Sequence, residues 1–375
     1  TTGSSNTATG YQSLKSNTTG SSSTASGYES LYSNTTGADN NASGYQSLYS
    51  NTTGTNNTAS GYKSLYSNTT GIYNTATGGK ALFSNTTGRY NNAVGSASLE
   101  FNTTGYENNA FGDYSLHYNT TGNKNIAVGS ESLYSNTTGK NNTAIGGRAL
   151  RSNTNGDYNV ATGSSSLYSN TTGTRNTASG LQSLYSNTTG SYNTASGFES
   201  LRYNTTGEQN TTSGYQSLYS NTTGADNNAS GYQSLYSNTT GNYNTASGYQ
   251  SLYSNTTGTN NSAFGYNAQA SAVDATNQTV IGYEATGQAD NSVVLGNDDV
   301  TAVYMGEDSG AKVYAGEGSF TGDMTIGGDV VVSSDARLKS NIVSLGSTLS
   351  RLLLIDGKSY EMKGKQKIGV LAQDI

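Results

Sequence analysis

The sequence predicts an all-β chain whose main part is a parallel β-solenoid with one coil per 17 residues. One glycine recurs at a constant spacing of 17 through sixteen units, a leucine follows it by four residues in fifteen of them, and a second glycine follows it by ten. Such strict phase indicates that every unit makes the same turn in space. The first glycine, called position 0, occurs at Gly10, Gly27, Gly44, Gly61, Gly78, Gly95, Gly112, Gly129, Gly146, Gly163, Gly180, Gly197, Gly214, Gly231, Gly248 and Gly265.

Each unit reads as short β-strands separated by glycine. The consensus is G-Y-Q-S-L-Y-S-N-T-T-G-x-x-N-T-A-S, in which N-T-A-x-G and Y-x-S-L-Y-S favour β-structure. Seventeen residues are too few for two packed helices with a connection, and this density of Gly, Asn, Thr and Ser opposes helix formation. We therefore expect successive coils to pair through backbone hydrogen bonds about 4.8 Å apart, with like residues above like.

The interior of the coils is expected to contain two ladders of apolar side chains. Leu14, Leu31 and their successors form one ladder at position +4, and alanines at position −2 form the other, with Thr212 as the exception. The glycines at positions 0 and +10 allow a positive φ or a close backbone approach. The phrase S-N-T-T-G, first seen at residues 16–20, is predicted to be a corner whose Asn and Thr hydrogen-bond locally and to their copies in adjacent coils.

One Leu and one Ala per coil make a lean core, so backbone and side-chain ladders must supply much of the stability. The 30 tyrosines, mostly at positions +1 and +5, offer amphipathic area that other chains could cover. We therefore expect a homotrimer wound about one axis. Low-complexity composition is also compatible with disorder, but sixteen units in phase favour a folded chain.

Composition excludes several functional classes. The chain has no Cys, Pro or Trp and one His, so disulfide scaffolds, Cys/His zinc sites and cysteine nucleophiles are ruled out, and no cofactor is expected. No window approaches 18 apolar residues, so no membrane span is predicted. The net charge of −6 argues against a nucleic-acid partner. The chain opens within a repeat, without Met or a signal peptide, which indicates a piece of a longer protein.

A shorter repeat follows the 17-residue units. Residues 279–296 read T-V-I-G-Y-E-A-T-G-Q-A-D-N-S-V-V-L-G, so Gly282 and Gly296 stand fourteen apart, each after a hydrophobic triplet. This resembles the β-roll of trimeric autotransporter adhesin heads, in which the triplets face the trimer interior. The 17-residue units, over 1–268, look like a longer and more polar relative of that head repeat, and the resemblance implies head-like 14-residue coils over 269–300.

The C-terminal part has a different character. Residues 301–334 alternate β-branched residues with glycine turns and predict a β-rich stalk. Residues 335–375 carry seven basic and four acidic residues, net +3, which leaves −9 for residues 1–334. This stretch contains S-D-A-R-L-K-S-N-I, then Y-E-M-K, then G-V-L-A-Q-D-I.

The order of these motifs resembles the intramolecular chaperone of endosialidase, which closes many phage tail spikes and fibres. The resemblance implies the start of a small α+β domain at 335–375, cut short after A-Q-D-I. Members of that family trimerise their fibre, assist its folding and then release themselves by autoproteolysis.

The resemblance also implies a self-cleavage site between Ser334 and Asp335. Ser334 would be the nucleophile and Lys339 the general base. A lysine acts as a base only where burial or nearby positive charge lowers its pKa, and Arg337 is a candidate for that charge. From the spacing alone, these residues would simply begin a surface helix. Because the domain is cut short, we expect the chain as given to stay uncleaved.

Other candidate functional residues are few. His117 occupies position +5, where Tyr is usual, and is interpreted as a tolerated substitution rather than a catalyst or ligand. N-T-T matches the N-glycosylation sequon in almost every coil, which we interpret as a by-product of the corner sequence. The carboxylates at the variable corners are interpreted as solvated surface groups rather than glycosidase acids: Asp39, Glu107, Asp113, Asp157 and Glu208.

Three functional classes stay open. The first and favoured one is a structural and adhesive fibre, extracellular on a virion or cell surface, with a cell-surface glycan or receptor as a further partner. The second is an enzyme, either a glycan-depolymerising tail spike or only the self-cleaving chaperone. A depolymerase should show clustered carboxylates and broken periodicity where a groove forms, and the sequence of the shaft predicts neither. The third is an ice-binding solenoid, suggested by the ladders of Thr18, Thr19 and their copies, which a Tyr-rich exterior would spoil.

Overall fold

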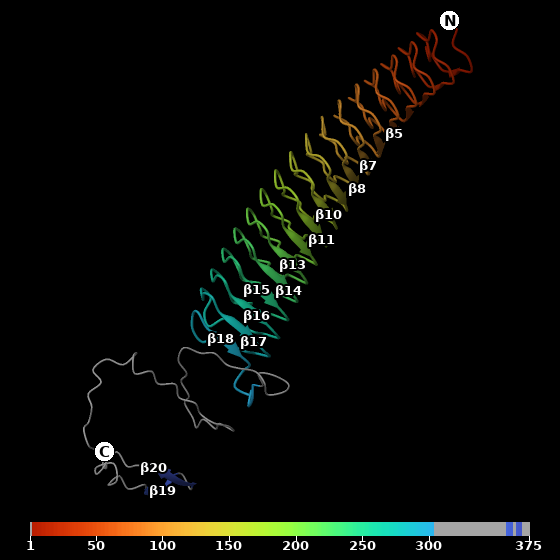
Figure 1. Ribbon diagram of the computed structural model, residues 1–375. Helices are drawn as coiled ribbons and strands as arrows, with labels where there is room; N and C mark the ends of the chain where they lie inside the picture. Colours follow the sequence, from red (N-terminus) through yellow and green to blue (C-terminus); the bar gives the residue numbers. More distant parts are fainter. Residues whose placement is uncertain (1, 304–357, 363–364, 370–375) are drawn as a thin grey trace, which may run out of the picture. The chain divides into compact units, whose positions relative to one another are not determined.

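The computed structural model describes residues 2–303, 358–362 and 365–369. The chain divides into two compact units, Thr1–Tyr304 and Met305–Ile375, and each is treated by itself below. The first unit is a parallel β-solenoid, as predicted, whose strands lie side by side along the shaft (Figure 1). The described residues contain strands, turns and bends but no α-helix.

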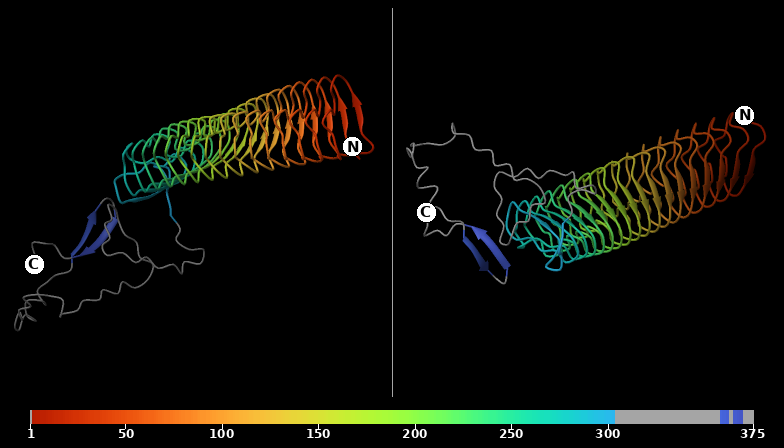
Figure 2. Two further views of the ribbon diagram at one scale, coloured as in Figure 1. Left: turned by 90° about the horizontal axis from the view of Figure 1, so that it is seen from above. Right: turned by 60° about the horizontal axis from the view of Figure 1, so that its bottom comes forward.

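Each coil contributes one three-residue strand, and the strand pairs in parallel with that of the next coil (Figure 2). Like positions lie opposite one another, for example Ala25 opposite Ala42. The spacing is 17 residues as far as the pairing of Ser262 with Thr279, and 14 for the last pairing, of Thr279 with Val293. The strands are β1 Thr7–Thr9, β2 Thr24–Ser26, β3 Asn41–Ser43, β4 Thr58–Ser60, β5 Thr75–Thr77, β6 Asn92–Val94, β7 Asn109–Phe111, β8 Ile126–Val128, β9 Thr143–Ile145, β10 Val160–Thr162, β11 Thr177–Ser179, β12 Thr194–Ser196, β13 Thr211–Ser213, β14 Asn228–Ser230, β15 Thr245–Ser247, β16 Ser262–Phe264, β17 Thr279–Ile281 and β18 Val293–Leu295.

The two predicted apolar ladders form the core. The leucines at position +4 are at most 1% exposed from Leu31 to Leu252, and the alanines at position −2 are equally buried from Ala25 onward. Thr212, the exception among the alanines, is also buried, and its hydroxyl group contacts the Ser200 hydroxyl at 2.6 Å. A polar side chain is therefore accepted in the alanine ladder because its hydrogen bond is made inside the core.

Two ladders of buried asparagines complete the interior, at positions +7 and +13. At position +7, Asn51 Nδ2 donates to Asn34 Oδ1 of the previous coil at 2.8 Å and to the Gly54 carbonyl at 3.0 Å. At position +13, Asn57 donates from both its backbone nitrogen and Nδ2 to Asn40 Oδ1. The corner prediction for S-N-T-T-G is confirmed, since Thr35 Oγ1 also donates to the Thr52 carbonyl of the next coil.

Outside the strand, the coil uses left-handed backbone at three non-glycine positions, +2, +4 and +12. In one coil these are Gln46, Leu48 and Asn56, with φ of 54°, 50° and 58°. This conformation costs an L-residue about 1–2 kcal/mol. This conformation allows backbone hydrogen bonds to both neighbouring coils. The Gln46 N–H donates to the Tyr28 carbonyl of the previous coil, and the Leu48 N–H donates to the Ser64 carbonyl of the next.

The two repeated glycines are required for different reasons. Gly44, at position 0, has a φ of 135°, which L side chains rarely adopt. At position +10, Gly122 has no such φ, but an added Cβ would overlap Asn119 Oδ1 and the Gly139 carbonyl oxygen. By contrast, Gly79 at position +1 has no atom within 4 Å of an added Cβ.

In the second unit, the described residues form one antiparallel pair of strands, β19 Lys358–Met362 and β20 Lys365–Gly369. Tyr360 lies opposite Lys367. β19 contains the first three residues of the Y-E-M-K motif.

Gly122→Ala should destabilise the shaft, because the added methyl group has no room between rigid backbone and a buried amide. We expect a loss of about 2–3 kcal/mol, measured as a fall in the urea midpoint of unfolding. Gly79→Ala is the matched control and should change the free energy of unfolding by less than about 0.5 kcal/mol. Equal effects of the two substitutions would contradict the close packing described for position +10.

Candidate functional site

The predicted self-cleavage residues Ser334, Asp335, Arg337 and Lys339 lie outside the described residues. Their assignment therefore stays a prediction. Among residues 2–303, 358–362 and 365–369, no group of three or more His, Cys, Asp or Glu side chains is placed to hold a metal ion.

His117 is part of an aromatic cluster on the shaft. It is 6% exposed, its ring stacks on Tyr134 at 5.2 Å, and it meets Phe101 and Tyr118 edge to face. Its Nδ1 lies 3.0 Å from the Ala97 carbonyl oxygen. These contacts give His117 a packing role, in agreement with its interpretation as a tolerated substitution.

The carboxylates at variable corners lie at the surface, as predicted, with Asp157 the most covered. Two of them bond to backbone in the previous coil: Asp113 Oδ1 accepts from Ser96 N at 2.8 Å, and Asp157 Oδ1 accepts from Lys140 N at 2.7 Å. They are spread over separate coils and do not converge as a pair of glycosidase acids would. The residues are Asp39, Glu107, Asp113, Asp157 and Glu208.

Sequence reasoning missed three ion-pair clusters that join positions +2 and +5. Lys80 Nζ lies 3.4 Å from Glu100 Oε1. The other carboxylate oxygen of Glu100, Oε2, lies 3.6 Å from His117 Nδ1. Further along the shaft, Arg202 pairs with Glu199. The signal was present in the sequence, because each cluster replaces the usual Tyr or Gln at these positions with a charged side chain or His.

The third cluster centres on Glu131. Its Oε2 accepts from Arg151 Nε at 2.8 Å and from Arg148 Nε at 3.2 Å. The hydrogen bond from Arg151 holds the pKa of Glu131 below its usual range, so the carboxylate stays ionised at neutral pH. The Arg151 guanidinium also lies over the Tyr134 and Tyr168 rings, 4.9 and 5.8 Å from their centroids.

Aromatic rings at position +1 form a surface ridge that is interrupted near the middle of the shaft. Neighbouring rings stack with centroids 4.9–5.5 Å apart from Tyr11 to Tyr62 and again from Phe198 to Tyr283. Between these stacks, seven coils carry no ring at this position. The residues there are Gly79, Ser96, Asp113, Ser130, Gly147, Ser164 and Leu181.

Within this gap the surface is hollowed over three consecutive coils. The hollow has a volume of about 280 Å³ and includes two side chains of the Glu131 cluster. The 17-residue repeat is thus broken at surface position +1, while the core positions keep it. The regular spacing of the glycines and leucines alone does not reveal this break. The lining residues are Ser130, Glu131, Gly147, Arg148, Ser164 and Ser165.

The same coils carry an apolar patch on the outward side of the strands, called the strand face below. In most coils the outward strand positions −3 and −1 hold Thr, Ser or Asn. From β6 to β10, six of them hold large apolar side chains that are 37–45% exposed. The patch consists of Val94, Phe111, Ile126, Val128, Ile145 and Val160.

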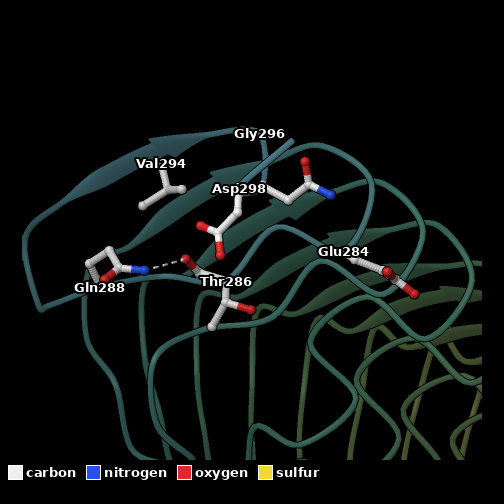
Figure 3. Close-up of a pocket in the computed structure, with 7 residues that line it drawn as sticks. Glu284, Thr286, Gln288, Val294, Gly296 and Asp298 are labelled. Carbon is white, nitrogen blue, oxygen red and sulfur yellow. Dashed lines mark hydrogen bonds between the residues drawn. The ribbon is translucent and has the colours of Figure 1, made fainter. Parts of the chain in front are cut away.

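A second hollow of about 250 Å³ lies at the C-terminal end of the solenoid (Figure 3). Its carboxylates come from Glu284 and Asp298, and Gln288 Nε2 donates to the Thr286 carbonyl at 3.3 Å. Figure 3 shows Asp298 turned toward Gln288 and Thr286, with Glu284 further off. The two carboxylates do not converge on one point, so the arrangement supports neither acid–base catalysis nor a metal site.

The asparagines of the N-T-T sequons are the buried ladder at position +7. Asn51 is 0% exposed, and its Nδ2 donates two hydrogen bonds inside the shaft. A glycan on this nitrogen would remove at least one of these hydrogen bonds and has no path to solvent. The folded coil therefore cannot carry such a glycan, in keeping with the sequon as a by-product of the corner.

Two comparisons bear on the identity of the chain. A search of curated proteins found no match to it. Among the residues that the structure describes, no helix is long and apolar enough to cross a membrane. Residues 334–375 match the family model described as chaperone of endosialidase, as their motifs predicted. Domains of this family are associated with trimerisation, and a parallel β-solenoid followed by such a segment fits a tail fibre or spike.

Proposed function

We propose that this protein is the shaft of a homotrimeric extracellular fibre, of the kind found as phage tail fibres or as cell-surface adhesins. Its C-terminal domain promotes trimerisation and folding of the shaft, and releases itself by autoproteolysis. The observation that carries this proposal is the family match at 334–375, in a chain whose larger part is a β-solenoid.

The apolar patch supports self-association of the shaft. Contiguous exposed apolar surface of a few hundred Å² marks interaction sites, and six large apolar side chains at 37–45% exposure approach that size. In chains aligned in parallel and in register, the patch of each copy meets the same patch of its neighbours. The strand face ends in further apolar residues, Phe264, Ile281 and Leu295, which are 42–45% exposed.

The resemblance to adhesin heads agrees with this face, because the triplets in that family face the trimer axis. In this chain the last two triplets are β17 and β18, whose outer residues Ile281 and Leu295 are exposed in a single chain. A trimer axis along the strand face would cover them. The ridge at position +1 and the side chains at +2 and +5 then stay on the outside of the fibre.

Replacing four patch residues by threonine should weaken the trimer without disturbing the coil. The variant carries Val94→Thr, Phe111→Thr, Val128→Thr and Ile145→Thr, and other coils have threonine at this position. We expect at least about a tenfold higher monomer–trimer midpoint concentration in sedimentation equilibrium, with an unchanged circular dichroism spectrum.

The control for this variant removes exposed rings outside the strand face, by Tyr28→Ser and Tyr45→Ser. Serine occupies the same position at Ser96 and Ser130, so the coil accepts it. The control should leave the midpoint as it is in the parent chain. A parent chain that sediments as a folded monomer at micromolar concentration would refute the proposed trimer.

For release of the C-terminal domain we propose Ser334 as nucleophile and Lys339 as general base. The Ser334 hydroxyl attacks the carbonyl carbon of its own peptide bond to Asp335, or of the equivalent bond in another chain, and the proton passes to Lys339. The amide nitrogen of Asp335 leaves with a proton, and water then hydrolyses the ester. The family match that begins at residue 334 supports this assignment.

Self-cleavage can be tested on the chain extended beyond Ile375 with the corresponding C-terminal portion of another member of this family, so that Ser334, Arg337 and Lys339 are kept. The chain should yield a fragment ending at Ser334, seen by mass spectrometry. Ser334→Ala should abolish the cut, and Lys339→Ala should nearly abolish it, because Arg337 stays protonated at any accessible pH. Both variants should still form trimers. A Ser334→Ala chain that still yields the 1–334 fragment would show that another protease makes the cut.

A depolymerase would need both broken periodicity and clustered carboxylates, and the described residues show the first, at position +1, without the second. Glu131 and Glu199 are bound to arginines rather than poised as acids for glycan cleavage. An ice-binding face would need a flat array of available threonine hydroxyls. Thr35 and Thr52 direct theirs to carbonyls of the next coil, which leaves a single exposed row in the N-T-T corner, at position +9, that includes Thr36.

A further inference from the structure

The hollow in the ring-free part of the ridge has the size and lining of a small ligand site. Its volume of about 280 Å³ is near the lower end of ligand pockets, which suits one sugar-sized ring rather than a long segment. Three consecutive coils build it, so its shape is fixed by the backbone ladder of the solenoid and does not depend on a mobile loop.

The fold does not require the small residues that open this hollow. An added Cβ on Gly147 would have only the Ser130 carbonyl oxygen within 4 Å, at 4.0 Å, and the φ of Gly147 is not left-handed. Other coils carry a stacked tyrosine at the same position, for example Tyr232. Because a ring would fit here, its absence shapes the surface and is not imposed by the core.

The polar groups in the hollow suit an anion that also carries hydroxyl groups. Arg148 uses its Nε for Glu131, and its side chain is 62% exposed. The two terminal nitrogens of a guanidinium form a fork that matches the two oxygens of a carboxylate. Ser130, Ser164 and Ser165 place hydroxyl groups around the same space. The cluster of Arg148, Arg151 and Glu131 carries a net charge of +1.

Glu131 holds this arrangement in place. One of its two carboxylate oxygens, Oε2, accepts hydrogen bonds from both Arg148 and Arg151. Arg151 is held in turn by its position over the Tyr134 and Tyr168 rings. An arginine oriented in this way loses less side-chain entropy when it binds a ligand than a free surface arginine does.

We propose that this hollow binds one acidic sugar residue of a surface polysaccharide, with the sugar carboxylate paired to Arg148 and the sugar hydroxyls to the three serines. The proposal rests on the proposed function as an adhesive fibre, and it places the glycan contact on the side of the shaft rather than on the strand face. Neutral sugars lack the partner for Arg148 and bind more weakly.

Binding is tested on the full chain with trigalacturonate, using its methyl ester as the uncharged probe of the same shape. Calorimetric or NMR titration should show binding of the acid and at least about tenfold weaker binding of the ester, the usual loss for one charge-assisted contact. Gly147→Tyr should abolish binding by filling the hollow, and Arg148→Gln should weaken it about tenfold. Gln is the residue of many other coils at position +2, so both variants should keep the parent circular dichroism spectrum.

Gly79→Tyr is the matched control, because it places a ring at the same coil position four coils from Gly147 and outside the hollow. It should leave trigalacturonate binding unchanged. The proposal is overturned if the acid and its ester bind equally, if neither binds, or if Gly79→Tyr weakens binding as much as Gly147→Tyr does. Sedimentation of the same samples separates the two proposals, since a trimer that ignores trigalacturonate refutes the sugar site alone, and a monomer refutes the trimer alone.

Discussion

The side-chain amide ladder at each corner is the interaction on which the rest of the shaft depends. Asn51 and Asn40, from positions +7 and +13, both donate to the carbonyl oxygen of Gly54, at 3.0 and 2.8 Å. The two ladders therefore meet at position +10. A buried amide without partners costs about 1–3 kcal/mol, and each asparagine finds one of its partners only in an adjacent coil. In a single coil the asparagine amides would therefore lack hydrogen-bond partners, and in stacked coils each coil supplies the partners of the next.

This dependence separates the interior from the surface. Leucine, alanine, two asparagines and two glycines recur because each contacts its own copy in the next coil. Positions −3, −1, +1, +2 and +5 point outward, and changes there leave the ladders intact. The chain uses that freedom in one region, where rings leave position +1, apolar side chains enter positions −3 and −1, and charged residues enter +2 and +5. The apolar patch and the hollow both arise from substitutions at outward positions, which leave the packing and hydrogen bonds of the core unchanged.

Periodicity was enough to predict the solenoid, its strand spacing and the burial of Leu31 and Ala25. It also predicted the corner at position +7, because the asparagine and the glycine sit in one recognisable phrase. The ladder at Asn57 was missed because its carbonyl partner, Gly71, lies fourteen residues away in the next coil. The left-handed φ of Leu48 was not predictable either, since leucine has no preference for it and the demand comes from hydrogen bonds to both neighbouring coils. Likewise, the cluster of Glu131, Arg148 and Arg151 joins residues up to 20 apart that converge only when coils stack.

Identical contacts between all neighbouring coils have a genetic consequence. A duplication or deletion of seventeen codons, starting anywhere in the repeats, restores the same glycine, asparagine and leucine partners on both sides of the change. Recombination between repeats can therefore lengthen or shorten the shaft by about 4.8 Å per event without creating an unfolded junction. Unequal crossing-over can therefore adjust in small, even steps how far the shaft extends from the particle or cell surface. The residues at the outward positions can evolve separately from this length.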